Sequence, residues 1–225
     1  MSLPLAVLVS GGGSNLQSLI DRIEAGALDA EIKLVVSNNS EAYGLTRARK
    51  HGIPTKVVVH SEYPTRGRFD REVLRAIAGA KAEAVILAGF MRILTPGFVN
   101  SFPQRILNIH PALLPSFPGA HGQRDAADFG VRISGCTVHF VDEMMDHGPI
   151  IIQAAVPAEP GEGGEALGAL VLKLEHRIYP QAVQWLAQGR LSIEDRFVRL
   201  EGSRPPADMA GAGPCLVSPP LEQGF

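Results

Sequence analysis

The sequence predicts an α/β fold, in which a mostly parallel, twisted sheet has helices on both faces and an antiparallel hairpin follows in the C-terminal part. Three observations lead to this prediction. Short, wholly apolar runs, such as residues 5–9 and 84–88, are typical of strands buried on both faces. Helical spacings of apolar residues alternate with these runs. Beyond His110, two apolar runs are joined by a short polar connection.

The chain begins with a strand, a glycine-rich turn and a helix. Residues 5–9 are the strand, and residues 10–15 (Ser-Gly-Gly-Gly-Ser-Asn) are the turn. Apolar residues then recur at helical spacing over residues 16–23. Ser14 and Gln17 match a capping box, in which two side chains bond free N–H groups at a helix start. We therefore expect this helix to begin with that box.

The alternation continues as far as His110. The predicted strands are residues 32–36, 56–59, 84–88 and 105–110, and the predicted helices are residues 43–50 and a segment with Phe69, Val73, Ile77 and Ala80 on one face. Gly52 stands just beyond the first of these helices, where glycine is favoured because the backbone turns left-handed there.

The second half is less regular. Residues 111–131 hold several prolines and glycines and predict a long loop with one short helix. Residues 136–141 and 150–154 predict the two strands of the hairpin. One long helix is expected over residues 166–186, and Pro180 is expected to kink it.

The composition is that of an ordinary globular protein: of 225 residues, 45% are hydrophobic and 20% are charged. No linker or internal repeat divides the chain. We therefore expect a single domain over residues 1–200 and a Pro/Gly-rich, poorly ordered tail over residues 201–225. The formal net charge of −2 offers no basic surplus, so nucleic acid is not an expected partner.

The cellular compartment is predicted from features that are missing. Cys136 and Cys215 are too few for a disulfide scaffold and form no CxxC pair. The first residues lack the charged and then apolar segments of a signal peptide. No apolar run approaches the roughly 20 residues of a membrane span. We expect a cytoplasmic protein without membrane contact.

The glycine-rich turn of residues 10–15 fits an anion site, because free N–H groups and the helix dipole favour a phosphate there. Leu16 stands where the dinucleotide fingerprint needs its third glycine, and no Gly-Lys-Ser/Thr of a Walker loop follows. A single phosphate, as in a sugar monophosphate, fits better than NAD or ATP. A tight turn with a helix cap is an equally good interpretation of the turn alone.

Asn108 and His110 are the best candidates for chemistry. They are two residues apart in a strand, so their side chains share a face, and they stand at its C-terminal end. Ligands bind outside the carboxyl ends of strands in open parallel sheets. An amide and an imidazole there can both donate to one developing oxyanion. The alternative is a hydrogen-bonded polar pair that ends a strand.

Asp146 lies in the connection of the predicted hairpin, where an aspartate is usually a turn residue. It gains interest if the hairpin folds back over His110, because a carboxylate there favours the protonated imidazole. His139 is expected to be an interior histidine with at most a supporting role.

The remaining candidates have ordinary interpretations. Arg66 precedes a helix and can bind an anion, but nearby Arg68 and Arg71 favour a solvated face. Glu175 is expected at the surface of the long helix, and residues 89–94 either line a slot for a flat heterocycle or pack into the core. The scattered histidines show no metal-ligand spacing, and no GxSxG elbow is present, so neither a metal nor a nucleophilic serine is expected.

Several motifs, taken together, resemble the folate-dependent phosphoribosylglycinamide formyltransferase family. They are Ser-Gly-Gly-Gly-Ser-Asn at residues 10–15, Leu-Ala-Gly-Phe-Met-Arg-Ile-Leu at 87–94, Leu-Asn-Ile-His-Pro-Ala-Leu-Leu-Pro at 107–115, Met-Asp-His-Gly-Pro at 145–149 and Glu-His-Arg-Ile-Tyr-Pro at 175–180. The likeness runs in order from about residue 5 to 200. It implies the Rossmann-like fold of formyltransferases.

The resemblance also implies roles for individual residues. Asn108, His110 and Asp146 would be the catalytic group. Gly13, Ser14 and Asn15 would hold the phosphate of glycinamide ribonucleotide, and Glu175 would contact its ribose or amine end. Met91, Arg92, Ile93, Leu94, Asn108 and Val141 would form the pterin pocket of the folate, and Arg66 would bind an anionic part of a substrate. Ala112, Ser116 and the loop at residues 120–124 depart from some members of the family.

The implied reaction is direct transfer of the formyl group of 10-formyltetrahydrofolate to the amine of glycinamide ribonucleotide, without metal or covalent intermediate. A monomer or homodimer is expected. A formyltransferase acting on methionyl-tRNA would need a basic face and a further RNA-binding domain, and a formyltetrahydrofolate hydrolase would leave the phosphate loop without a role. A nucleotide-binding module without catalysis would not need the Asn-His-Asp set.

Overall fold

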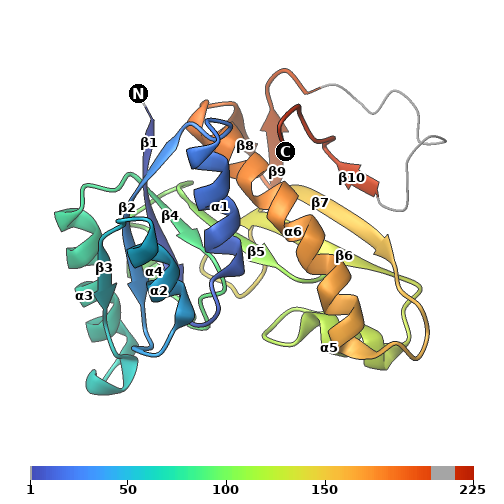
Figure 1. Cartoon of the computed structure of the whole chain (residues 1–225), viewed down its shortest axis with the longest axis horizontal. Helices are drawn as coiled ribbons and strands as arrows, with labels where there is room; N and C mark the ends of the chain where they lie inside the picture. The colour runs from blue at the N-terminus through green and yellow to red at the C-terminus, as the bar shows by residue number, and fades with distance from the viewer. Residues whose placement is uncertain (1, 204–215) are drawn as a thin grey trace. The chain divides into compact units, whose positions relative to one another are not determined.

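The computed structural model describes residues 2–203 and 216–225 (Figure 1). These fall into two compact units, Met1–Asn108 with Val141–Glu143, and Ile109–Phe140 with Met144–Phe225. Strand β5 (Ile106–His110) contributes residues to both units. The predicted α/β class, with a mostly parallel sheet and a separate antiparallel part, is confirmed.

The first unit is built on parallel strands in the order β5-β4-β1-β2-β3. The strands are β1 (Leu3–Val9), β2 (Ala30–Ser37), β3 (Thr55–Val57), β4 (Ala84–Leu87) and the first residues of β5. All four residues of β4 are buried, which explains its unbroken apolar sequence. Every strand predicted before His110 is present, with ends shifted by a few residues.

Helices connect these strands. They are α1 (Ser14–Glu24), α2 (Tyr43–Lys50), the 3₁₀ turn η1 (His60–Glu62), α3 (Arg66–Gly79) and α4 (Pro96–Val99). The apolar face predicted from Phe69, Val73 and Ile77 is buried in a core cluster with Ala6, Leu8 and Val85 of the strands. Helix α2 has the predicted bounds, and Gly52 beyond it has φ 69°.

The predicted capping box at the start of α1 is wrong. Gly13 is the N-cap, in a left-handed conformation, and no side chain caps the helix. A Cβ atom at Gly13 would lie 2.6 Å from the Cα of Gly44 at the start of α2. The close approach of two backbones therefore sets this helix start, and glycine is needed for space as well as for its φ of 69°.

The second unit contains antiparallel strands. β6 (Ile133–Phe140) pairs with β7 (Ile150–Pro157), β7 pairs with β10 (Leu216–Ser218), and β8 (Leu191–Glu194) pairs with β9 (Phe197–Leu200). The predicted hairpin is confirmed as β6–β7. The β8–β9 hairpin was not predicted, because its half-exposed strands are short and weakly apolar.

Two helices complete this unit, α5 (Gly122–Phe129) and α6 (Gly163–Ala187). Helix α5 is the short helix predicted after His110. Helix α6 continues through Pro180, which is buried inside it. The expectation of a poorly ordered tail is wrong for β10, which is the edge strand beside β7; residues 204–215 lie outside the described residues.

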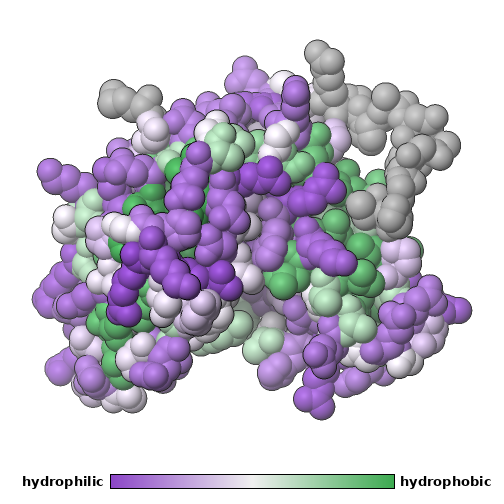
Figure 2. All heavy atoms as spheres, in the orientation of Figure 1, coloured by the Kyte–Doolittle hydropathy of each residue, from purple (hydrophilic) through white to green (hydrophobic). Residues whose placement is uncertain are grey.

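Hydrophilic side chains cover much of the visible face in Figure 2, with apolar side chains between them. Helices long and apolar enough to cross a membrane are absent from the described residues.

Replacing Gly135 in β6 by alanine is expected to destabilise the protein strongly. The added Cβ would lie 1.9 Å from the carbonyl oxygen of Ala154 in β7 and 2.9 Å from the Leu113 side chain. Because backbone must move, we expect at least the 1–3 kcal/mol typical of overpacking, or a fall in Tm of roughly 4–10 °C.

The matched control is Gly168→Ala in α6 of the same unit. Its Cβ would only reach van der Waals contact, 3.9 Å from the Gln123 side chain. Alanine is the better helix former, so Tm should hold or rise slightly. Equal Tm values for Gly135→Ala and Gly168→Ala, measured by circular dichroism, would contradict the packing described for β6.

The buried thiol of Cys136 makes stability depend on pH in a predictable direction. Burial raises the pKa of this thiol, and the charge of Glu175 raises it further. The folded state therefore keeps a proton that the unfolded state loses above about pH 8.5. The free energy of unfolding should fall as the pH rises beyond that value, by at most about 1.4 kcal/mol per pH unit from this group.

Urea unfolding of the natural protein and of Cys136→Ala between pH 7.5 and 10 measures this contribution, because other groups titrate equally in both. The two curves of free energy against pH should diverge above about pH 8.5. Parallel curves would show that Cys136 ionises as easily in the folded as in the unfolded chain.

Candidate active site

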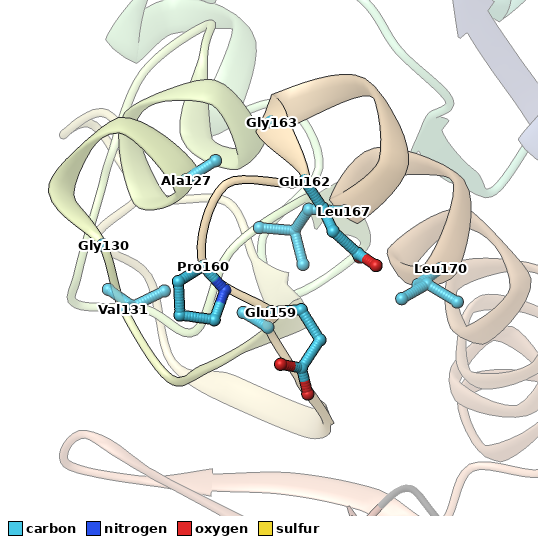
Figure 3. Close-up of a pocket in the computed structure, with 10 residues that line it drawn as sticks. Ala127, Gly130, Val131, Glu159, Pro160, Glu162, Gly163, Leu167 and Leu170 are labelled. Carbon is cyan, nitrogen blue, oxygen red and sulfur yellow. The ribbon is translucent and has the colours of Figure 1, made fainter.

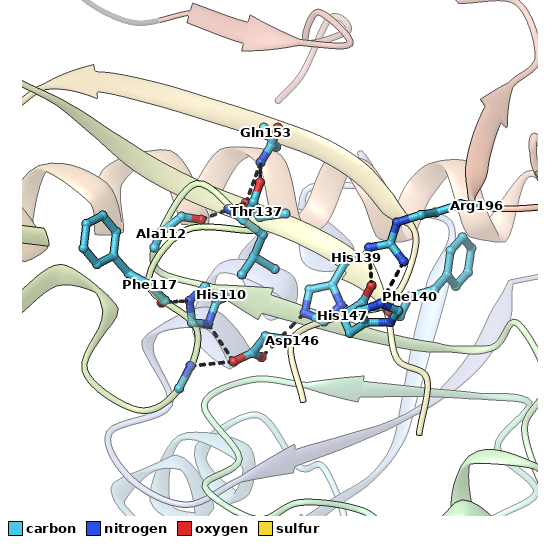
Figure 4. A network of polar contacts seen from close by, with 12 residues as sticks. His110, Ala112, Phe117, Thr137, His139, Phe140, Asp146, His147, Gln153 and Arg196 are labelled. Atoms are coloured by element: carbon cyan, nitrogen blue, oxygen red, sulfur yellow. Dashed lines mark hydrogen bonds and ion pairs between the residues drawn. The ribbon is translucent and has the colours of Figure 1, made fainter. Parts of the chain in front are cut away.

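His110 ends β5 and is the centre of a buried polar network in the second unit (Figure 4). Only 3% of its surface is exposed. Its Nε2 lies 2.8 Å from the carbonyl oxygen of Phe117, and its Nδ1 lies 3.5 Å from Oδ2 of Asp146. The structure therefore brings together the two residues that the sequence placed in separate elements.

The Asp146 carboxylate is fixed from several directions. Oδ2 accepts a hydrogen bond of 2.8 Å from the backbone N–H of Gly119 and also faces His110. Oδ1 lies 3.9 Å from Nε2 of His139. Asp146 is 12% exposed, and its backbone is left-handed with φ 50°. Aspartate tolerates this conformation better than most residues, although it remains uncommon.

His139 has the interior position that the sequence predicted. It lies in β6 and is 2% exposed, and its Nδ1 donates to the carbonyl oxygen of Phe140 over 2.8 Å. The Nδ1 proton leaves Nε2 of the neutral ring as an acceptor. Its contact with Asp146 is long, so a supporting role fits the distances.

The neighbours of His110 determine what its ring can do. A carbonyl oxygen and a carboxylate are both acceptors, so only the doubly protonated imidazole donates to both at once. Such a ring can deliver positive charge or a proton to a substrate oxygen. The position of the Phe117 carbonyl shows on which side of the ring an acceptor can bond to Nε2. Sequence reasoning missed this contact, because backbone groups leave no trace in residue types.

Asn108 belongs to the first unit, where it is the residue of β5 paired with Leu87 of β4. Its side chain is half-buried. That Asn108 shares a face with His110 stays a prediction from the alternation of side chains along a strand.

The glycine-rich turn is held by side chains from three segments. The Ser10 hydroxyl donates to Oδ1 of Asn38 and accepts from the backbone N–H of Met91 over 2.7 Å. Arg47 of α2 donates from Nε to the carbonyl oxygen of Gly12 over 2.9 Å. Ser14 is half-buried and Asn15 is buried. Arg47 was not predicted; its place in the last turn of α2, three residues after Gly44, was the available sign.

The segment after β4 presents two apolar side chains to solvent. Met91 is 64% and Ile93 50% exposed, while Leu94 is buried and Arg92 is half-buried. The end of the segment is fixed because Oδ2 of the buried Asp70 accepts from the Thr95 N–H over 2.7 Å. Phe90 and Leu94 of this segment pack into the core cluster, whereas Met91 and Ile93 do not, so the segment combines the two expected environments.

Two further candidates lie in the first unit. Val141 donates its N–H to the carbonyl oxygen of Ile106 over 2.9 Å and packs against the core cluster. Arg66 is the first residue of α3 and is exposed, as are Arg68 and Arg71. A solvated face and an anion site both remain compatible with Arg66.

The expectation that Glu175 lies at the surface is wrong. It is 5% exposed on α6, close enough to Cys136 for its charge to act on the thiol. Sequence alone gave the wrong answer because α6 is apolar over most of its circumference, so no face could be identified as the solvent side. A carboxylate is costly to bury unless it is paired or hydrogen-bonded.

A shallow pocket in the second unit lies between α5, α6 and the segment that precedes α6 (Figure 3). None of the predicted site residues lines it. Groups of three or more His, Cys, Asp or Glu side chains that could hold a metal ion are absent from residues 2–203 and 216–225.

Residues 3–183 match the model of the formyl transferase family. The chain is 43% identical, over 90% of its length and 95% of the relative's, to phosphoribosylglycinamide formyltransferase of Escherichia coli. It is 50% identical to part of the trifunctional purine biosynthetic protein adenosine-3 of Drosophila pseudoobscura pseudoobscura, covering 83% of this chain and 14% of that protein.

A solved structure agrees with these sequence relatives. The crystal structure of glycinamide ribonucleotide transformylase 1 from Symbiobacterium toebii has a TM-score of 0.87 and 44% identity, covering 88% of this chain and 94% of that one. The family model matches most of the chain, and the Escherichia coli relative is 43% identical over 90% of it. The chain therefore belongs to the formyl transferase family, among the phosphoribosylglycinamide formyltransferases.

Proposed function

We propose that this chain transfers the formyl group of 10-formyltetrahydrofolate to the amine of N1-(5-phospho-D-ribosyl)glycinamide, a step of purine biosynthesis. Membership of the family supports the reaction. The observation that supports the chemistry most directly is the buried His110 ring, 3.5 Å from the carboxylate of Asp146. Binding alone requires no such pair.

In the proposed mechanism, the free amine of the ribonucleotide attacks the formyl carbon, and a C–N bond forms as the carbonyl π electrons move to oxygen. The Asn108 amide and the protonated His110 donate to this oxyanion. When the intermediate collapses, the C–N10 bond to the folate breaks. The proton lost by the attacking amine is passed, with the help of Asp146, to the leaving nitrogen.

In this proposal, the Phe117 carbonyl oxygen occupies the position at Nε2 of His110 that the substrate oxygen takes when the substrate binds. Both are acceptors for the same Nε2–H, so only one can be bonded at a time. Phe117 has φ 52°, an uncommon backbone conformation for a residue other than glycine. Substrate binding would then displace the Phe117 carbonyl.

The ribonucleotide is proposed to bind through its phosphate at Gly13, Ser14 and Asn15, the anion-binding start of α1. Glu175 is proposed to contact its ribose or amine end. The anchored glycine turn supports this proposal, because preformed N–H donors lose little freedom when they bind.

The folate is proposed to bind with its pterin against Met91, Arg92, Ile93 and Leu94, next to Asn108 and Val141. The exposure of Met91 and Ile93 supports this assignment. Arg66 is proposed to bind an anionic part of a substrate, either the folate or a phosphate. We further propose a cytoplasmic location, a monomer or homodimer, and a single functional domain over residues 1–200.

One assay separates this function from its competitors. The protein is mixed with 10-formyltetrahydrofolate, with and without the ribonucleotide, and folate absorbance is followed. Release of tetrahydrofolate that requires the ribonucleotide supports the proposal. Release without it would identify a hydrolase, and no release would identify a binding module.

The catalytic assignments predict large losses of turnover. Asn108→Ala and His110→Ala should each lower kcat at least about 10²-fold, the usual effect of removing one oxyanion donor. Asp146→Asn should also lower kcat strongly, because an amide cannot stabilise the charged imidazole of His110. Steady-state kinetics with both substrates measures these effects.

The matched control is Asp128→Asn. Asp128 is an exposed carboxylate of α5 that lies 3.5 Å from Nε of Arg124, one helical turn away. Its kcat should stay within twofold of the natural protein. Near-normal turnover of Asp146→Asn would remove the proposed role of that carboxylate.

The phosphate assignment predicts a selective effect of Gly13→Ala. Its Cβ would force the turn away from Gly44, so the N–H donors would shift. We expect KM for the ribonucleotide to rise about tenfold to a hundredfold, with a much smaller change in KM for the folate.

Gly26→Ala is the control for backbone strain. Gly26 also has φ 69°, but its Cβ would meet nothing within 4 Å. This variant should lose stability without losing affinity for the ribonucleotide. If both glycine variants change KM alike, the loss reflects general destabilisation, and the phosphate assignment of the turn is wrong.

A further inference from the structure

We propose that Arg196, at the turn of the β8–β9 hairpin, is a positioning residue that holds the segment of Asp146 and His147 in place, so that the Asp146 carboxylate faces His110. This inference deepens the proposed function and rests on the catalytic role proposed there for Asp146. It concerns a part of the chain from which no site residue was predicted.

The contact is made by two nitrogens of one guanidinium. Nη2 of Arg196 donates to the backbone carbonyl oxygen of His147 over 2.7 Å, and Nη1 lies 3.3 Å from Nε2 of the His147 ring (Figure 4). A guanidinium has only donors, so Nε2 of His147 takes the role of acceptor. Charged donors at such short distances make stronger hydrogen bonds than neutral ones. Arg196 thus binds the residue adjacent to Asp146 at two points.

The segment needs an anchor because its conformation is not the preferred one. Asp146 has φ 50°, and a residue in this region is maintained only when its surroundings fix it. Met144 and Met145, just before it, are more than half exposed and supply little packing. On the other side, the Pro149 carbonyl accepts from the Phe140 N–H over 2.9 Å. Arg196 provides the backbone anchor between these points.

The β8–β9 hairpin is suited to this task. Glu194 pairs with Phe197, so only Asp195 and Arg196 form the turn, and Asp195 has φ 55°. At the other end, the Glu201 N–H donates to the Arg190 carbonyl over 2.9 Å, and Nε of Arg190 donates to the Glu201 carbonyl over 2.8 Å. Because a tight turn joins the two strands at one end and hydrogen bonds join them at the other, the hairpin holds Arg196 in a defined position.

A shift of this segment would affect the contact between Asp146 and His110 most. The Oδ2 atom of Asp146 accepts from the Gly119 N–H at 2.8 Å but lies 3.5 Å from Nδ1 of His110, at the long limit for a hydrogen bond. A small shift of the Asp146 backbone therefore weakens the contact with His110 first. Arg196 is exposed, so its removal should cost little stability while it disturbs this geometry.

Arg199 provides a matched comparison. It lies in β9 of the same hairpin, is exposed like Arg196, and donates from Nε to Oε2 of Glu194 over 2.9 Å. That partner belongs to the hairpin itself, so Arg199→Ala removes an equal charge without removing the contact with His147.

The experiment measures kcat and KM for Arg196→Ala, Arg196→Lys, Arg199→Ala and His147→Ala. We expect Arg196→Ala to lower kcat about tenfold with both KM values within twofold, and Arg199→Ala to change neither. Arg196→Lys should recover part of kcat, because an ammonium can still donate to the carbonyl oxygen. His147→Ala keeps that carbonyl and should have a smaller effect than Arg196→Ala.

Hydrogen–deuterium exchange provides a readout that does not depend on activity. Backbone amides of residues 144–149 should exchange faster in Arg196→Ala than in Arg199→Ala, with equal Tm values. Equal kcat and equal exchange in the two variants would overturn the proposal. Asp146→Asn distinguishes the failure of this inference from the failure of the proposed function. Normal turnover of Asp146→Asn would remove the proposed role of Asp146. An inactive Asp146→Asn together with a normal Arg196→Ala would refute only the role of Arg196.

Discussion

The contact between His110 and Asp146 is the constraint on which the second unit depends. The buried imidazole lies between the Phe117 carbonyl oxygen, 2.8 Å from Nε2, and the Asp146 carboxylate, 3.5 Å from Nδ1, and a buried polar group without a partner would be costly. Phe117 and Asp146 both have left-handed backbones. Two irregular segments therefore adopt uncommon conformations around a residue that a regular strand holds in place.

The first unit follows a different constraint, the close approach of loops at the carboxyl ends of parallel strands. Gly13 lets two backbones approach so closely that a Cβ on it would lie 2.6 Å from the Gly44 Cα. Ser10 connects the glycine turn to the segment after β4 through the Met91 N–H, and Asp70 fixes the end of that segment through Thr95. Hydrogen bonds between neighbouring loops thus pre-organise the donors and the apolar side chains that the proposed substrates would contact, which lowers the entropy lost on binding.

Both units place candidate functional groups on loops that rigid elements support. β5 supplies Asn108 and His110 from a strand, where side-chain direction is fixed by the backbone. The loops supply Met91, Ile93 and Asp146, and hydrogen bonds to neighbouring segments anchor these loops. This division is consistent with chemistry in which a donor stays in place while substrates enter and leave.

The sequence by itself determined the alternation of strands and helices up to His110, both ends of α2, the β6–β7 hairpin and the motifs of the family, because these depend on local periodicity and residue type. Only the tertiary structure decided that Glu175 is buried, that Gly13 rather than a capping box starts α1, and that β10 pairs with β7. It also decided that Asp146 and Phe117 meet at His110 and that Arg196 contacts His147. These depend on contacts between residues distant in the chain and on backbone carbonyls and N–H groups. Every residue has those groups, so no residue type reveals which of them will be used.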